Sequence, residues 1–172
     1  MGEVDHVVVT GLMASGKTTV GRLLAHRLGW TWRDSDLDIE TATGSTVREL
    51  REHDGVDAMH AREAAQLLDA LGATEPSVIS AAASVVDQPA TRAALRRPGV
   101  AVIWLHAAPE ILARRFDSAD EHRPAYGNDP ETFLAQQAAE REPLLPEIGA
   151  HVLDVDGHTP DDLVAQAMDV LR

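Results

Sequence analysis

Eight residues near the N-terminus have the types and the spacing of a phosphate-binding loop. The segment from Gly11 to Thr18 reads Gly-Leu-Met-Ala-Ser-Gly-Lys-Thr and satisfies the pattern G-x-x-x-x-G-K-[ST]. Glycines in such a loop let backbone N–H groups face the phosphates, the lysine reaches the β- and γ-phosphates, and the last hydroxyl holds Mg²⁺. We therefore expect a bound nucleoside triphosphate with Mg²⁺. The expected contacts are Gly11, Ala14, Ser15, Gly16, Lys17, Thr18 and Thr19, with Thr18 also on the metal.

Two carboxylates follow the next apolar run along the chain. Asp34 and Asp36 come directly after the segment Trp30–Arg33, which we expect to be a strand, and open α/β sheets bind their ligands at the carboxyl ends of strands. If the chain stays extended, a separation of two residues places both side chains on one side. One carboxylate can then orient the water shell of the metal, while the other accepts a proton from a hydroxyl that attacks the γ-phosphate. The alternative is a solvated acidic turn, because Asp38 and Glu40 extend the acidic run.

Five short apolar runs predict the strands that position these residues. Several of the runs are apolar on both faces, as buried parallel strands tend to be. They are His6–Thr10, Trp30–Arg33, Ser77–Ser80, Val100–Leu105 and His151–Val155. Helical patterns lie between them, so the chain alternates between strand and helix throughout. This alternation predicts an α/β fold.

Capping residues and apolar periodicity predict the helices. The first helix runs from about Gly16 to Leu28 and ends at Gly29, and Thr46 with Glu49 forms a capping box that opens a short helix. One long helix precedes the third strand and ends before Gly72, with an apolar stripe made of Val56, Met59, Glu63, Leu67, Leu68 and Leu71. Later helices begin at prolines, two of which follow a capping residue: Pro109, Pro130 after Asp129, and Pro160 after Thr159.

Composition narrows the classes of partner. The 172 residues suit one domain with one core and one main site. The chain has 15 Lys plus Arg against 28 Asp plus Glu, and its formal net charge of -13 argues against a nucleic acid partner. No cysteine is present, which excludes disulfides and thiolate metal sites and is compatible with the cytoplasm. We expect neither a signal peptide nor a membrane span. The oligomeric state is left open, and a monomer is compatible with the sequence.

Taken together, these residues resemble the shikimate kinase family over nearly the whole chain. The shared features keep that family's order and spacing: the phosphate loop, the run DSDLDIE at 34–40, Thr43-Gly44, Asp54-Gly55, Arg123-Pro124 and Arg-Glu-Pro-Leu at 141–144. The resemblance implies a three-layer α/β/α P-loop kinase fold with a five-stranded parallel sheet, formed by residues 1–172 as one domain. It also implies a mobile lid at about 116–129, the most polar and least periodic stretch. The activity implied is ATP-dependent, Mg²⁺-requiring phosphorylation of a ring hydroxyl of a small metabolite.

Position by position, the resemblance assigns roles to five residues. Asp34 corresponds to the metal-side carboxylate, and Asp36 to the partner and base of the substrate hydroxyl. Arg123 corresponds to a lid arginine that approaches the transferred phosphate, and Arg141 to an arginine that clamps the substrate carboxylate. Arg115 stands where the family stacks an arginine on adenine. The expected catalytic set is Lys17, Asp36 and Arg123.

The three arginines also have structural explanations. Arg115 is consistent with a solvated cation in the last turn of its helix, where positive charge is favoured. Arg141 stands between Glu140 and Glu142 and is consistent with a surface ion pair. For Arg123 the alternative is a loop arginine without a function.

The departures from the family gather where it binds its acceptor. His60 replaces an arginine that binds the substrate carboxylate, and Arg51 replaces a phenylalanine. Three glycines after the third strand have become Ala81, Ala82 and Ala83, where a positive φ would cost about 1 kcal/mol or more and methyl groups intrude. We therefore expect a rebuilt acceptor pocket. Its expected substrate contacts are Asp36, Arg51, His60, Ala81, Ala82, Ala83 and Arg141.

Several acceptors and one different class of function stay open. Shikimate is the first expectation, and another cyclic polyol, sugar acid or hydroxy acid is the next. The changes are also consistent with neutral drift around an unchanged substrate, with Arg51 supplying the missing charge. A gluconate-kinase-like protein would share the phosphate loop but fits the aspartate pair and the later arginines less well. A nucleotide-binding regulatory homologue without transfer activity is the other class, and retention of Lys17, Asp36 and Arg123 argues against it.

Overall fold

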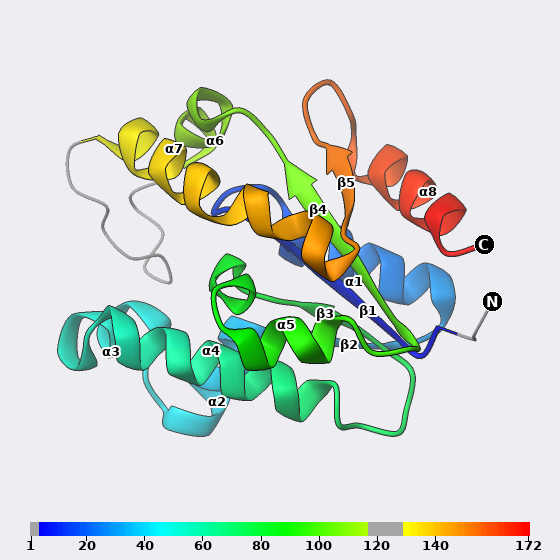
Figure 1. Ribbon diagram of the computed structural model, residues 1–172, viewed down its shortest axis with the longest axis horizontal. Coiled ribbons are helices and arrows are strands. Elements are labelled where there is room, and N and C mark those ends of the chain that lie inside the picture. The colour runs from blue at the N-terminus through cyan, green and yellow to red at the C-terminus, as the bar shows by residue number, and fades with distance from the viewer. Residues whose placement is uncertain (1–3, 117–128) are drawn as a thin grey trace.

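Five parallel strands form one central sheet in the computed structural model, which describes residues 4–116 and 129–172 (Figure 1). Within these residues the strands are β1 His6–Gly11, β2 Thr31–Asp34, β3 Ser77–Ser80, β4 Val100–His106 and β5 His151–Asp154. Their order across the sheet is β2-β3-β1-β4-β5, and each pair is parallel. β1 lies in the middle with all six residues buried, which agrees with its unbroken apolar sequence. The five predicted strands are confirmed.

Helices cover both faces of the sheet. α1 (Lys17–Leu28) and α8 (Pro160–Val170) pack side by side on one face, and α5 (Pro89–Leu95) packs on the other against α4 (Val56–Ala70), as Figure 1 shows. The remaining helices are α2 Ser35–Thr43, α3 Val47–Asp54, α6 Pro109–Arg115 and α7 Pro130–Arg141, with 3₁₀ turns η1 at Ala83–Val86 and η2 at Glu142–Ile148. The three-layer α/β/α fold is therefore confirmed. In the described part of the chain, no helix has the length and apolar character needed to cross a membrane.

The capping residues act as the sequence predicts. The Thr46 side chain accepts from the backbone N–H of Glu49, whose carboxylate accepts from the N–H of Thr46, so α3 begins with a capping box. α1 ends at Gly29, which adopts a left-handed conformation with φ 70°. Asp129 and Thr159 cap the helices that begin at the following prolines. Local sequence thus sets where these helices begin and end.

The predicted apolar stripe of α4 is only partly correct. Met59, Leu67 and Leu71 are buried, but Val56 and Leu68 are 40% and 43% exposed. Leu68 lies one residue beyond Leu67, and 100° per residue turns it away from the core. Val56 is in the first turn of α4, where it borders a cleft instead of the core.

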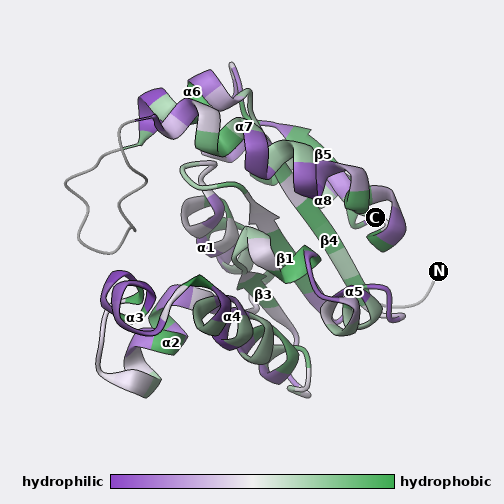
Figure 2. Ribbon diagram, turned by 60° about the vertical axis from the view of Figure 1, so that its left-hand side comes forward, coloured by the Kyte–Doolittle hydropathy of each residue, from purple (hydrophilic) through white to green (hydrophobic). Residues whose placement is uncertain are grey.

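The buried apolar residues form two clusters of very different size. The larger one contains residues of β1, β3, β4 and β5 and of the helices packed on them, among them α1, α4, α5, α7 and α8, and includes Val8, Leu24, Ile79 and Trp104. Figure 2 shows the strands in hydrophobic colours and several outer helices in hydrophilic ones. The smaller cluster, between α2, α3 and α4, consists of Ile39, Val47, Leu50 and Met59. The α2–α4 segment therefore has only a small core of its own.

Candidate active site

A cleft of ≈ 460 Å³ lies at the carboxyl ends of β1, β2 and β3, between α3 and α4 on one side and α7 on the other. Its volume is that of a typical small-molecule site, and its position is where open parallel sheets bind ligands. The cleft brings together most of the predicted site residues: Ala14, Gly16, Lys17, Thr18, Thr19, Asp34, Asp36, Arg51, His60, Ala81, Ala82, Ala83 and Arg141. Predicted site residues as far apart in the sequence as Ala14 and Arg141, which are 127 positions apart, therefore line the same cleft.

The phosphate loop has the backbone of an anion-binding turn. Gly11 has φ 153°, and a Cβ there would lie 2.5 Å from the carbonyl oxygen of Leu105, so only glycine lets the chain pass β4. Gly16 has φ 94° and precedes α1, whose first turn carries no acidic residue. The helix N-terminus therefore presents its positive end to the cleft. Gly11 itself is buried beneath the loop and does not line the cleft.

Three side chains of the loop are placed for a triphosphate. The Lys17 ammonium donates to the carbonyl of Leu12 at 3.2 Å and lines the cleft. The Thr18 hydroxyl donates to Asp34 Oδ2 at 2.9 Å. The Ser15 hydroxyl is buried and, within the described residues, has no hydrogen-bond partner. A buried polar group without a protein partner is uncommon, so this hydroxyl is a candidate ligand contact.

The two aspartates both line the cleft, but the backbone that carries them differs from the expected one. The chain does not stay extended, because β2 ends at Asp34 and α2 begins at Ser35. Asp34 Oδ1 caps this helix by accepting from the N–H groups of Asp36 at 3.0 Å and Leu37 at 3.2 Å. Asp36 is exposed in the first turn of α2 and lines the same cleft. The alternative of a solvated acidic turn is wrong for Asp34, which is 6% exposed.

The oxygen atoms near the loop suit Mg²⁺ bound together with a nucleotide. Among residues 4–116 and 129–172 there is no group of three or more His, Cys, Asp or Glu that would hold a metal without other ligands. Mg²⁺ in kinase sites usually takes one or two protein oxygens and completes its shell with phosphates and water. The Thr18 hydroxyl and the Asp34 carboxylate supply such oxygens side by side. The residues present therefore fit the ion.

Three of the predicted acceptor residues line the cleft from three different helices. Arg51 comes from α3, His60 from α4 and Arg141 from the end of α7. Burial lowers the pKa of His60, and the charges of Arg141 and Arg51 lower it further. His60 is therefore neutral at pH 7 and does not replace the charge of an arginine.

The three alanines after β3 form an unstrained turn. The N–H of Ala81 donates to the carbonyl of Val9 at 2.9 Å, and the Thr10 hydroxyl donates to the carbonyl of Ala82 at 3.2 Å. Ala82 has φ -61° and is followed by η1. In the described chain, Ala14 is the one residue other than glycine with positive φ. The cost that a positive φ would bring at these alanines does not arise, because the turn proceeds into a 3₁₀ helix that alanine adopts freely.

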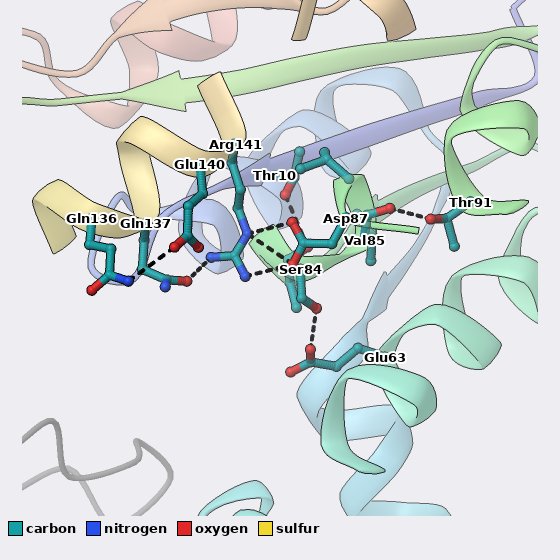
Figure 3. A network of polar contacts seen from close by, with 12 residues as sticks. Thr10, Glu63, Ser84, Val85, Asp87, Thr91, Gln136, Gln137, Glu140 and Arg141 are labelled. Carbon is teal, nitrogen blue, oxygen red and sulfur yellow. Dashed lines mark hydrogen bonds and ion pairs between the residues drawn. The ribbon is translucent and has the colours of Figure 1, made fainter. Parts of the chain in front are cut away.

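Arg141 is neither exposed nor paired with its neighbours in sequence. Its side chain is 7% exposed, and Nε and Nη2 donate to the Asp87 carboxylate at 3.0 and 2.8 Å. Nη1 donates to Gln137, one turn earlier on α7 (Figure 3). The alternative of a surface pair with Glu140 or Glu142 is therefore wrong. Nothing in the sequence around Asp87 indicated this partner.

Glu63 is a cleft residue that the sequence analysis assigned to the apolar stripe of α4. It accepts a hydrogen bond from Ser84, at the turn after β3 (Figure 3). Burial of the carboxyl raises its pKa to about 7, the bond from Ser84 opposes this, and the charge of Asp36 adds to it. A carboxylate inside an apolar stripe was the available signal, because such a residue rarely packs in a core without a partner.

A smaller hollow of ≈ 260 Å³ adjoins the loop on its other side. It is lined by Ser15, Thr19 and Arg115, together with residues of α8 and the segment before it. Arg115 lies in the last turn of α6, as expected. This hollow is the candidate site for the base of the nucleotide. Arg123 and nearly all of the predicted lid lie outside the described residues.

Comparison with known proteins agrees with this architecture. The family model described as "Shikimate kinase" matches residues 13–172. A shikimate kinase from Symbiobacterium thermophilum is 38% identical over 170 residues, which cover 97% of this chain and 96% of the relative. One from Acinetobacter baylyi is 33% identical over 169 residues, covering 98% and 92%. The solved structure of shikimate kinase from Acinetobacter baumannii in complex with shikimate has a TM-score of 0.85 at 29% identity, covering 98% of this chain and 93% of that one.

Proposed function

The chain belongs to the shikimate kinase family of ATP-dependent phosphotransferases with an alcohol acceptor, and we propose that it transfers the γ-phosphate of Mg-ATP to a ring hydroxyl bound beside Asp36. One observation carries the proposal. The Thr18–Asp34 hydrogen bond joins the phosphate loop to the start of α2, so that Lys17, at the loop, and Asp36, in the first turn of α2, face one cleft. This arrangement suits a phosphate donor on one side and a hydroxyl on the other.

Different residues of the chain have different roles in the proposed transfer. The phosphate loop and the N-terminus of α1 bind the phosphates, and the Lys17 ammonium stabilises charge on the transferred group. Asp36 orients the acceptor hydroxyl and takes its proton as the new O–P bond forms and the bond from the γ-phosphorus to the departing ADP breaks. When bound, Mg²⁺ on Thr18 and Asp34 would neutralise phosphate charge. Positioning supplies most of the rate in such reactions, so the walls of the cleft contribute by holding donor and acceptor in line.

Two arginines complete the proposed nucleotide site. Arg115 borders the smaller hollow and is placed to stack on the base. The resemblance of the His122-Arg123-Pro124 segment assigns Arg123 to the transferred phosphate, where an arginine is worth about 10³- to 10⁵-fold in rate. Shikimate is the first acceptor to test, because the relative from Acinetobacter baumannii is described in complex with it.

Replacement of Asp36 tests the proposal. We expect Asp36→Asn to lower kcat for acceptor-dependent ADP formation by about 10²- to 10⁴-fold, because an amide cannot take the proton. The affinity for ATP should stay within about 3-fold, since Asp36 lies on the acceptor side. Asp57→Asn is the matched control, because Asp57 is an exposed carboxylate on α4 outside the cleft. An undiminished rate in Asp36→Asn would refute the proposed role. ATP binding without turnover of any ring polyol by the native chain would favour a regulatory homologue.

A further inference from the structure

The partner of Arg141 points to the class of acceptor that this cleft takes. We propose that Asp87 makes the cleft select an uncharged ring polyol over a polyol that carries a carboxylate. The inference rests on the proposed kinase function and concerns the acceptor end of the same site. It assigns Asp87, which lies just after η1, as a specificity-determining residue.

Arg141 already holds a carboxylate in the folded chain. Its Nε and Nη2 donate to Asp87 at 3.0 and 2.8 Å, and its Nη1 donates to Gln137. All three nitrogens therefore have a protein acceptor, as Figure 3 shows. The paired contact from Nε and Nη2 is the fork by which arginine binds a carboxylate, and here Asp87 occupies it. With 7% of the side chain exposed, little of the guanidinium faces the cleft.

The charges around the acceptor end nearly balance without a ligand. Arg51 and Arg141 contribute two positive charges, Asp36 and Asp87 contribute two negative ones, and Glu63, with its pKa of about 7, adds a partial negative charge at pH 7. His60 stands close enough to feel Arg141, Asp87 and Arg51, but its lowered pKa keeps it neutral at pH 7. An acceptor carboxylate would therefore add an unbalanced negative charge to a cleft that also receives the phosphates of the donor. An uncharged polyol adds none.

Burial of Glu63 shows what a carboxylate costs in this part of the cleft. Its pKa is raised to about 7 although Arg141 and Arg51 both act to lower it. Burial and the charge of Asp36 outweigh the two arginines at this position. A pKa of about 7 leaves part of Glu63 protonated near neutral pH, and the protonated form can donate a hydrogen bond to a hydroxyl. A carboxylate of the acceptor would meet the same burial, and the two arginines do not fully offset its cost here.

A carboxylate ligand could reach the fork of Arg141 only by displacing Asp87. The displaced carboxylate would lose two hydrogen bonds while it remains only 35% exposed. Leaving one member of a buried charge pair unpaired commonly weakens binding by about 30-fold or more. Because Asp87 keeps part of its surface in water, we expect a discrimination of about 10-fold.

Two acceptors that differ only in the carboxylate test the inference. Shikimate and its primary amide share the ring and its hydroxyls, and differ in charge. For the native chain with Mg-ATP, we expect kcat/KM for the amide to exceed that for shikimate by about 10-fold. The ratio is measured in one protein sample, so it does not depend on the fraction of active protein. A native preference for shikimate would overturn the inference while leaving the kinase function intact.

The variant Asp87→Asn tests the residue itself. Its amide oxygen can still accept from Arg141, but the charge is gone, so we expect the amide-to-shikimate ratio to fall by about 10-fold or more. The control Asp57→Asn removes a negative charge near His60 without touching Arg141, and should change the ratio by less than about 2-fold. If Asp87→Asn loses shikimate turnover specifically, Asp87 orients Arg141 for a carboxylate and the inference is wrong. An unchanged ratio overturns it as well. If the native chain turns over neither of these two acceptors nor any uncharged ring polyol, the kinase function and this inference are both refuted.

Discussion

The two sides of the cleft are built in different ways. On the donor side, backbone conformation makes the site: β1, the loop and α1 pack into the large core, and several of the residues involved are fully buried. On the acceptor side, side chains make it: α2, α3 and α4 share a small core of four residues, Arg141 pairs with Asp87, and Ser84 donates to Glu63. The donor side is therefore held by close packing, whereas the acceptor side combines packing with contacts among polar groups.

This difference shows where each side tolerates change. A site made of backbone N–H groups depends on a few positions that admit no larger side chain, such as Gly11 and Gly21. A site made of paired charges can change its ligand through one substitution, because each partner sets the charge and the hydrogen bonds of the other. Sequence departures from the family gather on the acceptor side, as this contrast predicts.

The packing of α1 on β3 gives the largest expected effect on stability. A Cβ at Gly21 would lie 2.2 Å from the Ser80 hydroxyl, which donates to the carbonyl of Lys17 at 3.0 Å and accepts from Trp32 Nε1 at 3.1 Å. Gly21→Ala should therefore lower the free energy of unfolding by about 3 kcal/mol, from overpacking and lost hydrogen bonds, less the helix propensity gained. Urea denaturation measures the change.

A double variant shows whether the clash is the cause. Ser80→Ala removes the hydroxyl that the new methyl group would meet, so Gly21→Ala should cost less than about 1 kcal/mol when added to Ser80→Ala. An equally large cost in both backgrounds would mean that the donor side is not limited by packing at this contact.

Glu63 gives the next largest effect, on the acceptor side. In the unfolded chain its carboxyl has the ordinary pKa of 4.5, and burial raises the pKa to about 7 in the folded state. Because the folded state binds the proton more tightly, this residue lowers the stability progressively as pH rises from about 4.5 to 7, and by a constant amount above pH 7. Part of Glu63 still faces the cleft, so we expect the full loss to be about 2 kcal/mol.

The variant Glu63→Gln isolates that contribution. The amide stays neutral and can still accept the hydrogen bond from Ser84, so the variant should match the native chain at pH 4 and exceed its free energy of unfolding by about 2 kcal/mol at pH 8. Denaturation curves at a series of pH values measure the difference. If the free energies of unfolding of the two proteins change with pH in the same way over this range, the carboxyl is not held in its neutral form.

The two sides also differ in how far the sequence predicts them. The phosphate loop, Asp34 and the strand ends follow from local patterns, because spacing along one segment determines which groups the backbone presents. The sequence did not predict that α2 begins at Ser35. The residues Asp34 to Asp36 are compatible both with an extended chain and with a helix capped by Asp34, and the local pattern does not choose between the two. The Arg141–Asp87 pair joins residues 54 positions apart through the fold, and no local spacing encodes it. Glu63 was visible only as a carboxylate among apolar neighbours.

Replacement of Ala14 by glycine gives the smallest expected effect on stability. The same replacement at Ala82 allows the two sides of the cleft to be compared. Ala14 adopts φ 64° in the phosphate loop, a conformation that costs alanine about 1 kcal/mol and glycine almost nothing. Glycine gives back about half of this through the extra freedom of the unfolded chain, so Ala14→Gly should stabilise by about 0.5 kcal/mol and raise Tm by about 1 to 2 °C. The same change on the acceptor side, Ala82→Gly, starts from φ -61° and relieves nothing, so it should destabilise by about 0.5 to 1 kcal/mol. Calorimetry should therefore show shifts in Tm of opposite sign for the two variants. A loss of stability in both would mean that the donor loop carries no strain at Ala14.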